Sequence, residues 1–231
     1  MATVESKKIG ALLRKTHLLT HASIEELENL VKSPELNTFR ARQVIYLPGD
    51  RSKGVHFLIG GRVKVSKVTR DGKELTLAYR TEGDFFGDGC LVTRGPREEM
   101  TEAMEPSSSV EVPWESLLAL VDSNPKVASF LARVTLIRQR DLESKFEQLI
   151  FKDVGAKLAE LLLELGTRHG VVSQSGLELA LKITHQELAN LIGSTRETVS
   201  LTLSQFKRKG YITTEGRRVI LADQDGLRSL G

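Results

Sequence analysis

Hydrophobic and polar positions follow different spacings along the chain, and these spacings divide the sequence into three parts. Between residues 39 and 113 short apolar runs are broken every few residues by Gly, Asp or Pro, which is typical of strands in a sandwich or barrel. After Pro125 neither Pro nor Gly occurs until Gly155, so one long helix is expected as far as Ile150. Shorter helical patterns follow. The sequence therefore predicts an α+β protein with domains at residues 1–122, 123–150 and 151–231.

The strand-rich part contains clear alternation and turn signals. Residues 62–66 alternate polar and apolar side chains and lead to Asp71-Gly72, a dipeptide that favours a hairpin turn, before a second alternating run at residues 75–79. Helix starts are marked as well, because Ser23 and Glu26 have the spacing of a capping box and Asp153 precedes a new apolar helical pattern. The basic stretch before residue 20 is expected to form a short helix or arm, and residues 166–176 a polar loop or an irregular strand.

Residues 183–207 predict two short helices around one tight turn. Apolar residues recur at helical spacing on both sides of Gly193, at positions 188, 191 and 192 and at positions 199, 203 and 206. Glycine suits the turn itself, and Ser194 or Thr195 can cap the helix that follows.

The second helix of this pair carries side chains that suit base edges in a major groove. Arg196, Glu197 and Ser200 lie near its start and off its apolar stripe. An arginine donates twice to guanine, and a glutamate accepts from the amino group of cytosine. An ordinary buried helix pair does not explain why these groups cluster. The sequence therefore predicts a helix-turn-helix whose recognition helix covers residues 195–207.

Positive charge gathers in the same region. The net charge of the chain is only +3, but residues 194–218 contain six basic residues against two acidic ones. Such an excess favours contact with phosphates. Residues 211–213 and 218–221 flank Glu215-Gly216 and are expected to form a β-hairpin wing, whose Arg217 and Arg218 can reach a phosphate backbone.

Composition excludes several classes of protein. Cys90 is the only cysteine, which excludes an intrachain disulfide framework and a protein-ligated iron–sulfur cluster, so an ordinary buried thiol is expected. No long apolar run and no signal-peptide core is found, and we expect a cytoplasmic protein without a membrane partner. The strand-rich part has His56 as its only histidine, whereas metal sites on such folds gather several. We therefore predict no metal, no catalytic residue and no enzyme activity.

The order of these parts resembles the CRP/FNR superfamily of bacterial transcription regulators. Four segments carry the resemblance: GGRVKV (60–65), GDFFGD (83–88), FKDVGAKLAELLLEL (151–165) and ITHQELANLIGSTRETVS (183–200). It implies an N-terminal jelly-roll-like β-roll, similar to cyclic-nucleotide-binding domains, then a long dimerisation helix and a C-terminal winged helix-turn-helix. It further implies a homodimer on double-stranded DNA with a two-fold related site. Activators of the family touch RNA polymerase through the segment that corresponds to residues 167–176.

The resemblance assigns roles to residues of the recognition helix. Arg196 and Glu197 correspond to a pair that reads a G·C-containing half-site, and Ser200 corresponds to a base-contacting serine. Leu201 departs from the family, which often has arginine at this position. One expected base contact is therefore missing.

Residues at the start of the first helix resemble phosphate-binding residues of the family. These are Thr184, His185 and Gln186, and N-capping is the alternative role for Thr184. The predicted DNA-binding residues are thus Thr184, His185, Gln186, Thr195, Arg196, Glu197, Ser200, Lys207, Arg217 and Arg218.

In the roll, the resemblance implies a candidate ligand pocket formed by Gly87, Asp88, Arg97, Glu98, Glu99, Leu142 and Glu143. Cyclic-nucleotide members use an Arg-Ser pair to neutralise the phosphate, and an alignment without gaps places Glu98 and Glu99 there. Two carboxylates repel a phosphate, although a small shift of the alignment brings Arg97 into place. Leu142 and Glu143 correspond to positions where cyclic-nucleotide members have side-chain hydroxyls that contact the base of the nucleotide. We therefore expect no cyclic AMP and no cofactor; the alternative is a regulator gated by a cyclic nucleotide or another small ligand.

The long helix is expected to pair across a dimer axis, because its apolar stripe needs a partner. The predicted dimer residues are Leu131, Leu142, Phe146 and Leu149. Packing on its own roll is the alternative. Trp114 and the pair Phe85-Phe86 are expected in the core of the roll.

Overall fold

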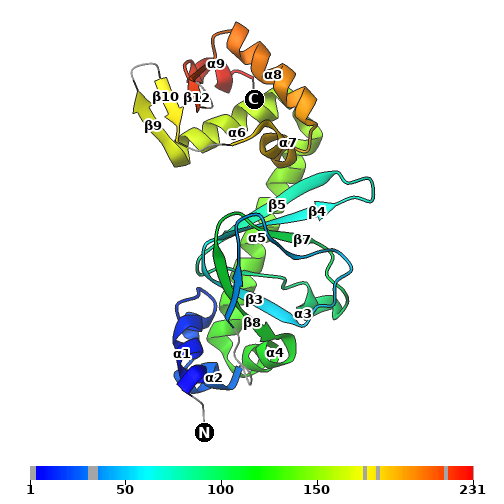
Figure 1. Cartoon of the computed structure of the whole chain (residues 1–231), viewed down its shortest axis with the longest axis vertical. Coiled ribbons are helices and arrows are strands. Elements are labelled where there is room, and N and C mark those ends of the chain that lie inside the picture. Colours follow the sequence, from blue (N-terminus) through cyan, green and yellow to red (C-terminus); the bar gives the residue numbers. More distant parts are fainter. Residues whose placement is uncertain (1–3, 31–35, 174–175, 181–182, 216–217, 231) are drawn as a thin grey trace. The chain divides into compact units, whose positions relative to one another are not determined.

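The computed structural model describes residues 4–30, 36–173, 176–180, 183–215 and 218–230, apart from the side chains of residues 4–6, 148–151 and 215. The chain divides into two compact units, Met1–Gln139 and Arg140–Gly231, and each is described by itself. Figure 1 shows both units and labels those elements for which there is room. Within the described residues no helix is both long and apolar enough to cross a membrane.

The first unit is a β-roll with helices packed on it. Its two four-stranded sheets have the strand orders β1-β8-β3-β6 and β2-β7-β4-β5. The strands are β1 (Leu36–Phe39), β2 (Val44–Tyr46), β3 (Gly54–Gly60), β4 (Arg62–Val68), β5 (Glu74–Thr81), β6 (Phe85–Phe86), β7 (Met100–Ala103) and β8 (Ser107–Pro113). The helical segments are α1 (Val4–Leu13), the 3-10 turn η1 (Leu19–His21), α2 (Ile24–Leu30), α3 (Cys90–Thr93), α4 (Trp114–Ser123) and the start of α5 (Pro125–Phe151). The predicted β-roll is confirmed.

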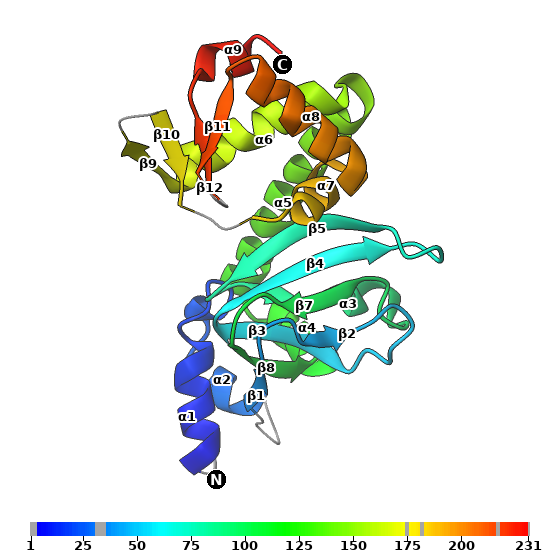
Figure 2. The same cartoon turned by 45° about the horizontal axis from the view of Figure 1, so that its top comes forward.

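The hairpin of β4 and β5 forms where the alternating runs predict it, as Figure 2 shows. Its turn closes through the Thr69 N–H, which donates to the Lys73 carbonyl at 2.9 Å. By contrast, β8 cannot be identified in the sequence from an alternation of polar and apolar residues. Two of its buried residues are Ser107 and Ser109, which are 6% and 0% exposed, so polar side chains occupy core-facing positions of this strand.

The main core of the first unit lies between the helices and the sheet that contains β3 and β8. Its buried residues include Leu13, Leu18, Leu27, Phe57, Val110, Val112 and Leu117. Phe85 and Phe86 are 3% and 1% exposed, as predicted. The prediction for Trp114 is correct only in part, because its ring is half-buried and the Arg94 guanidinium lies 4.8 Å from the ring centroid.

The predicted capping box at α2 is present, and α5 is capped by a side chain as well. At α2 the Ser23 N–H donates to the Glu26 carboxylate at 2.6 Å, and the Glu26 N–H donates to the Ser23 hydroxyl oxygen at 3.2 Å. At α5 the Asn124 side-chain oxygen accepts from the backbone N–H groups of residues 126 and 127, at 3.1 and 3.2 Å. These bonds satisfy donors that the first turn of a helix otherwise leaves unpaired.

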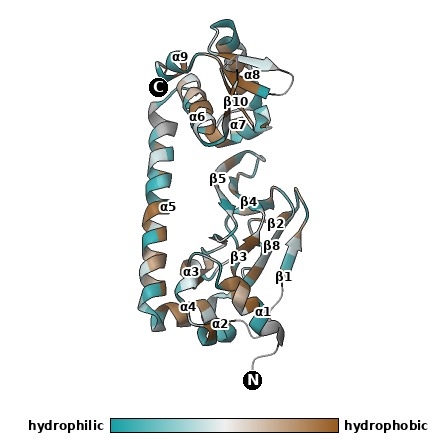
Figure 3. Ribbon diagram, turned by 90° about the vertical axis from the view of Figure 1, so that its left-hand side faces the viewer, coloured by the Kyte–Doolittle hydropathy of each residue, from teal (hydrophilic) through white to brown (hydrophobic). Residues whose placement is uncertain are grey.

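Helix α5 has a face that packs on the roll and further apolar residues that do not. Phe130, Leu131 and Val134 pack against the core of the roll, so at Leu131 the alternative interpretation, packing on its own domain, applies. Four large apolar residues farther along are exposed: Leu136 (60%), Ile137 (60%), Leu142 (49%) and Phe146 (65%). Figure 3 shows how hydrophobic and hydrophilic residues alternate along α5. The side chain of Leu149, also predicted in the dimer interface, lies outside the described residues.

The second unit surrounds the helix-turn-helix with a small sheet. Its elements after α5 are α6 (Val154–His169), β9 (Gly170–Ser173), β10 (Gly176–Leu179), α7 (His185–Ile192), α8 (Arg196–Arg208), β11 (Ile212–Glu215), β12 (Arg218–Leu221) and α9 (Gln224–Arg228). The sheet has the strand order β11-β12-β10-β9. The Asp153 side chain caps α6 by accepting from the Ala156 N–H at 2.8 Å, as predicted.

A polar loop or an irregular strand is expected at residues 166–176, and this is wrong for residues 166–169, because α6 continues to His169. Strand β9 covers residues 170–173 and β10 begins at Gly176, while residues 174–175 lie outside the described residues. Gly166 does not end the helix. A Cβ atom at this glycine would lie 2.9 Å from side-chain atoms of both Leu177 and Leu221, so the missing side chain lets the sheet pack closely on α6. The sequence alone does not distinguish a glycine that allows close packing from a glycine that ends a helix.

His56 is a buried histidine of the roll. It is 7% exposed, its ring stacks on Phe86 with centroids 4.9 Å apart, and its Nδ1 lies 3.2 Å from the Ser109 hydroxyl oxygen. Glu111 lies 3.5 Å from Nε2, but its carboxylate is also paired with Arg97 at 3.3 Å. Burial, with the nearby Arg97 charge, lowers the pKa of His56 to about 3. The folded protein therefore keeps this ring neutral.

This lowered pKa predicts a loss of stability in acid. An unfolded histidine has a pKa of about 6.5, so below that pH the unfolded chain binds a proton that the folded chain excludes. The contribution of His56 to the free energy of unfolding is complete above pH ~6.5 and decreases as the pH falls toward about 3. Between pH 7 and pH 5 the free energy of unfolding should decrease by about 2 kcal/mol more in wild type than in His56→Gln.

Urea unfolding followed by fluorescence of Trp114, the only tryptophan, measures this loss in the first unit. His21→Gln, which replaces an exposed histidine of the same unit, controls for the loss of an imidazole as such. If the free energy of unfolding depends on pH equally in wild type and in His56→Gln, the lowered pKa of His56 is contradicted.

Candidate nucleic-acid interface

The two helices of the candidate interface are fixed at their ends by local hydrogen bonds. Thr184 and Glu187 form a capping box at α7, in which the Glu187 N–H donates to the Thr184 hydroxyl oxygen at 3.1 Å and the Thr184 N–H donates to the Glu187 carboxylate at 2.7 Å. Gly193 then takes the left-handed conformation, with φ 64° and ψ 44°. Of the two predicted caps for α8, Thr195 is the one used, and it accepts from the Thr198 N–H at 3.2 Å.

Helix α8 has one face in the core and one face turned outward. Val199, Leu203 and Phe206 are 0%, 4% and 4% exposed and pack with α6 and α7 in one cluster. The predicted contact residues Arg196, Glu197 and Lys207 are all exposed. The packing therefore holds the helix while leaving its polar side chains available, which is the arrangement that a major-groove helix requires.

Ser200 joins the two helices rather than standing free. Its hydroxyl donates to the Arg196 carbonyl at 2.9 Å, and its oxygen lies 2.8 Å from Nδ1 of His185 at the start of α7. Because the single hydroxyl proton goes to the carbonyl, the His185 Nδ1–H is the donor of the second bond. His185 thus steadies the first turn of α8, a role that sequence reasoning missed. The DNA roles assigned to His185 and Ser200 remain predictions.

Gln186 lies at the exposed rim of the helix pair, and Arg218 lies in the wing. Gln186 is exposed, and its amide donates to the Asn190 side chain at 2.8 Å. The wing predicted from the sequence is the hairpin of β11 and β12. In it Arg218 is paired with Glu178 of β10 at 2.9 Å, and Arg217 lies outside the described residues.

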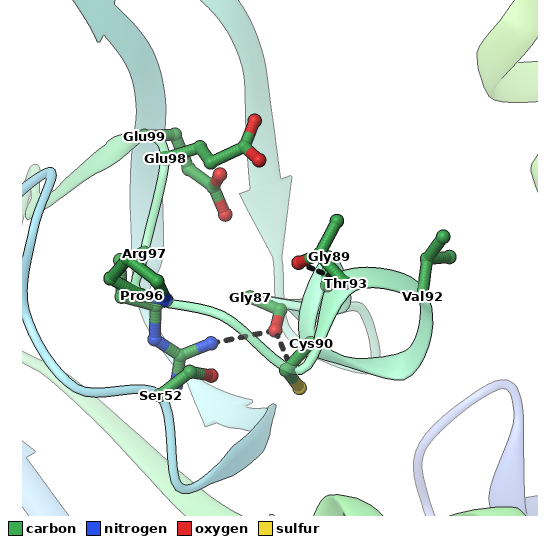
Figure 4. A pocket seen from close by; sticks show the side chains of 10 residues that line it. All are labelled: Ser52, Gly87, Gly89, Cys90, Val92, Thr93, Pro96, Arg97, Glu98 and Glu99. Carbon is green, nitrogen blue, oxygen red and sulfur yellow. Dashed lines mark hydrogen bonds between the residues drawn. The ribbon is translucent and has the colours of Figure 1, made fainter.

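A pocket of about 130 Å³ in the roll contains most of the predicted ligand residues, as Figure 4 shows. Its lining includes Ser52, Gly87, Cys90, Arg97, Glu98 and Glu99. Arg97, Glu98 and Glu99 all line the pocket, as the sequence predicts. A cation therefore lies beside the two carboxylates, as the shifted alignment predicts.

The Arg97 guanidinium is already engaged by the protein. It is 5% exposed, donates to the carbonyls of Gly87 at 2.6 Å and Gly54 at 2.7 Å, and pairs with Glu111 at 3.3 Å. It also lies 4.5 Å from the centroid of the Tyr46 ring. This arginine holds the β-roll together at the pocket floor, so a bound anion would have to compete with these partners.

The two carboxylates of the pocket have partners of their own. Glu98 pairs with Lys67 at 3.3 Å in an exposed contact, and Glu99 accepts from the Tyr46 hydroxyl at 3.3 Å. Burial first, and the Glu99 charge second, raise the pKa of Tyr46, so the phenol stays protonated and can donate. A negative ligand entering here meets two carboxylates.

Asp88 is turned toward α5 instead of the pocket. Its carboxylate pairs with Arg138 at 2.9 Å, and the same guanidinium donates to the Phe85 carbonyl at 2.8 Å. Asp88 is not among the residues that line the pocket. Arg138 was not predicted as part of this site, because a contact across 50 residues leaves no local signal. Leu142 and Glu143 belong to the second unit, and their predicted place in the pocket stays a prediction.

Cys90 is the buried thiol that was expected. It is 4% exposed, its Sγ donates to the Gly87 carbonyl at 3.3 Å, and burial raises its pKa. A thiol with a raised pKa is a poor nucleophile and a poor redox switch. Among the described residues no group of three or more His, Cys, Asp or Glu side chains is placed to hold a metal ion.

Comparison with known proteins gives consistent matches over both units. The cyclic nucleotide-binding domain family matches residues 36–124, and the Crp-like helix-turn-helix domain family matches residues 156–230. The CRP-like cAMP-activated global transcriptional regulator of Mycobacterium tuberculosis is 31% identical over 180 residues, which are 78% of this chain and 79% of that protein. The global nitrogen regulator of Nostoc sp. is 31% identical over 80% of this chain and 84% of its own. A solved CRP/FNR-family transcriptional regulator from Thermus thermophilus is 28% identical, with a TM-score of 0.62 over 85% of this chain and 97% of its own.

Proposed function

This chain belongs to the CRP/FNR family of DNA-binding transcription regulators, and we propose that it acts as a homodimer that reads a two-fold related DNA site. The predicted family is confirmed, and so is the prediction that the protein is not an enzyme, since the matched relatives are transcription regulators. The observation that carries the proposal is the division of α8 into a buried apolar face and an exposed face with Arg196 and Glu197. Because the partner is DNA, the same proposal places the protein in the cytoplasm.

Base reading is assigned to the first turn of α8. Arg196 can donate twice to guanine, while Glu197 can accept from the amino group of cytosine, so together they suit a G·C pair. Lys207 in the last turn carries a compact ammonium charge and lacks the planar pair of donors that an arginine has. It therefore suits a phosphate rather than a base edge. The interface thus separates residues that specify sequence from residues that supply affinity.

Dimerisation is assigned to the exposed apolar face of α5. Leu142 and Phe146 are four residues apart and therefore share one side of the helix. Exposing such large side chains to water is unfavourable, and a second copy of α5 would cover them. The dimer would place its two α8 helices at the spacing of one DNA turn, about 34 Å.

The proposed regulator is not switched by cyclic AMP. The Arg97 guanidinium is held by Gly87, Gly54 and Glu111, and Glu98 and Glu99 line the same pocket. A cyclic phosphate would have to displace those partners and approach two carboxylates. Gating by a cyclic nucleotide or another small ligand is the second candidate, and the presence of Arg97 in the pocket favours it.

RNA polymerase is a proposed partner if the protein activates transcription. The family segment for that contact corresponds to residues 167–176, which here include β9. Val171 and Val172 of this strand are 59% and 87% exposed, so an apolar surface is available for a protein partner.

Two substitutions should separate specificity from affinity. Arg196→Ala should cost about 1–3 kcal/mol on the preferred site and relax the preference at one base pair, because it removes a bidentate base contact. Lys207→Ala should weaken binding to all sequences alike and reduce its salt dependence. Fluorescence anisotropy with a selected duplex and a scrambled duplex measures both effects. Equal affinity of wild type for the two duplexes would contradict sequence-specific reading.

Phe146→Glu should convert the dimer to a monomer, because it places a charge in the proposed apolar seam. Analytical ultracentrifugation gives the mass directly. Ile137→Glu is the matched control: Ile137 is 60% exposed on α5, nine residues before Phe146 and thus on the opposite side of the helix. A variant Phe146→Glu that remains dimeric, or a wild type that is monomeric at micromolar concentration, would contradict the assignment.

Calorimetric titration with cyclic AMP and with cyclic GMP should show no specific binding at millimolar ligand. The affinity for the selected DNA duplex, measured on the same sample, should not change when either nucleotide is added. Tight binding of either nucleotide that also strengthens DNA binding would replace this proposal by the ligand-gated candidate.

A further inference from the structure

Leu201 is a large apolar side chain on the outward face of α8. It is 67% exposed, whereas the other leucine of the same helix, Leu203, is 4% exposed and packs in the core. Nothing in the folding of the second unit requires leucine at this position, because the side chain lies outside the buried cluster. A single exposed leucine is ordinary on a protein surface, so its meaning here depends on which face of the helix it occupies.

The outward face on which Leu201 lies can be defined from the helical spacing. The buried residues Val199, Leu203 and Phe206 mark the side of the core, and the residues opposite them are Glu197, Leu201, Ser204 and Arg208. These four follow the spacing i, i+4, i+7 and i+11 and form one stripe along the helix. Leu201 is therefore central to the surface that faces the groove when Glu197 reaches a base.

We propose that Leu201 reads the C5-methyl group of a thymine in the major groove. This inference rests on the proposed function, because it needs α8 to enter that groove. Leucine has no hydrogen-bond donor or acceptor beyond its backbone, so it cannot read guanine, cytosine or adenine by their polar edges. The thymine methyl is the one apolar group that a base pair presents in the major groove, and apolar side chains contact it.

The position of the thymine follows from the geometry of the helix. Leu201 comes four residues after Glu197, which corresponds to about 6 Å along the helix axis. Base pairs are about 3.4 Å apart along the duplex. A helix that runs along the groove therefore sets Leu201 about two base pairs from the pair read by Glu197. The half-site should contain a thymine at that distance from its G·C pair.

The test begins with selection of binding sites for wild type from a random duplex library. In the enriched half-site, the thymine about two base pairs from the G·C pair is then replaced by deoxyuridine, which removes only the C5-methyl group. Wild-type affinity should fall about fourfold, the scale for taking one methyl group out of an apolar contact. Leu201→Ala should bind the two duplexes equally.

Two further variants complete the test. Ser204→Ala changes the neighbouring residue of the same stripe and should keep the response to uracil, while Leu201→Arg should shift selection at that position from thymine to guanine. Thermal melts of all variants should be alike, since both side chains are exposed.

The outcomes separate this inference from the proposal on which it rests. An enriched site whose uracil substitutions leave wild-type affinity unchanged overturns the role of Leu201 and leaves sequence-specific binding intact. Equal sensitivity of wild type and Leu201→Ala to uracil overturns it as well. A library that yields no enriched sequence overturns the proposed function itself, and this inference with it.

Discussion

The burial of one face of α8 is the interaction on which the rest of the second unit depends. Val199, Leu203 and Phe206 enter a core shared with α6 and α7, and the loss of one such side chain typically costs several kcal/mol. Because this face is fixed, the direction of every outward side chain is fixed with it. The contact between His185 and Ser200 and the cap at Thr195 then determine how the first turn is presented. Specific contacts to bases require such rigid support.

In the first unit, one short loop connects the candidate pocket to the long helix. Gly87 accepts a hydrogen bond from Arg97 on the pocket side, while the next residue, Asp88, pairs with Arg138 of α5. The guanidinium of Arg138 also lies 4.1 Å from the centroid of the Phe85 ring. A ligand that changed the partners of Arg97 would act on the same loop that anchors α5. The charged side chains that line this pocket are therefore paired with other residues of the roll and are not free to bind an anion.

Local signals made much of the fold predictable from the sequence. The capping box at Ser23, the N-caps at Thr184 and Asp153 and the turn at Gly193 each depend on residues within a few positions of one another, and all are present. Long-range contacts were not predictable in this way. The pairing of Asp88 with Arg138 and the use of Gly166 for close packing depend on residues brought together only by the folded chain. Arg97, Glu98 and Glu99 line the pocket as predicted, but the partners that hold the Arg97 guanidinium come from distant parts of the chain.

In the proposed function, two copies of α8 read one DNA site together. Hydroxyl-radical footprinting of wild type on a selected duplex tests it most directly, because it maps each protected sugar along both strands. We expect two protected stretches related by two-fold symmetry, with centres about 10 base pairs apart on one face of the duplex. A single protected stretch, or uniform weak protection along the whole duplex, would contradict it.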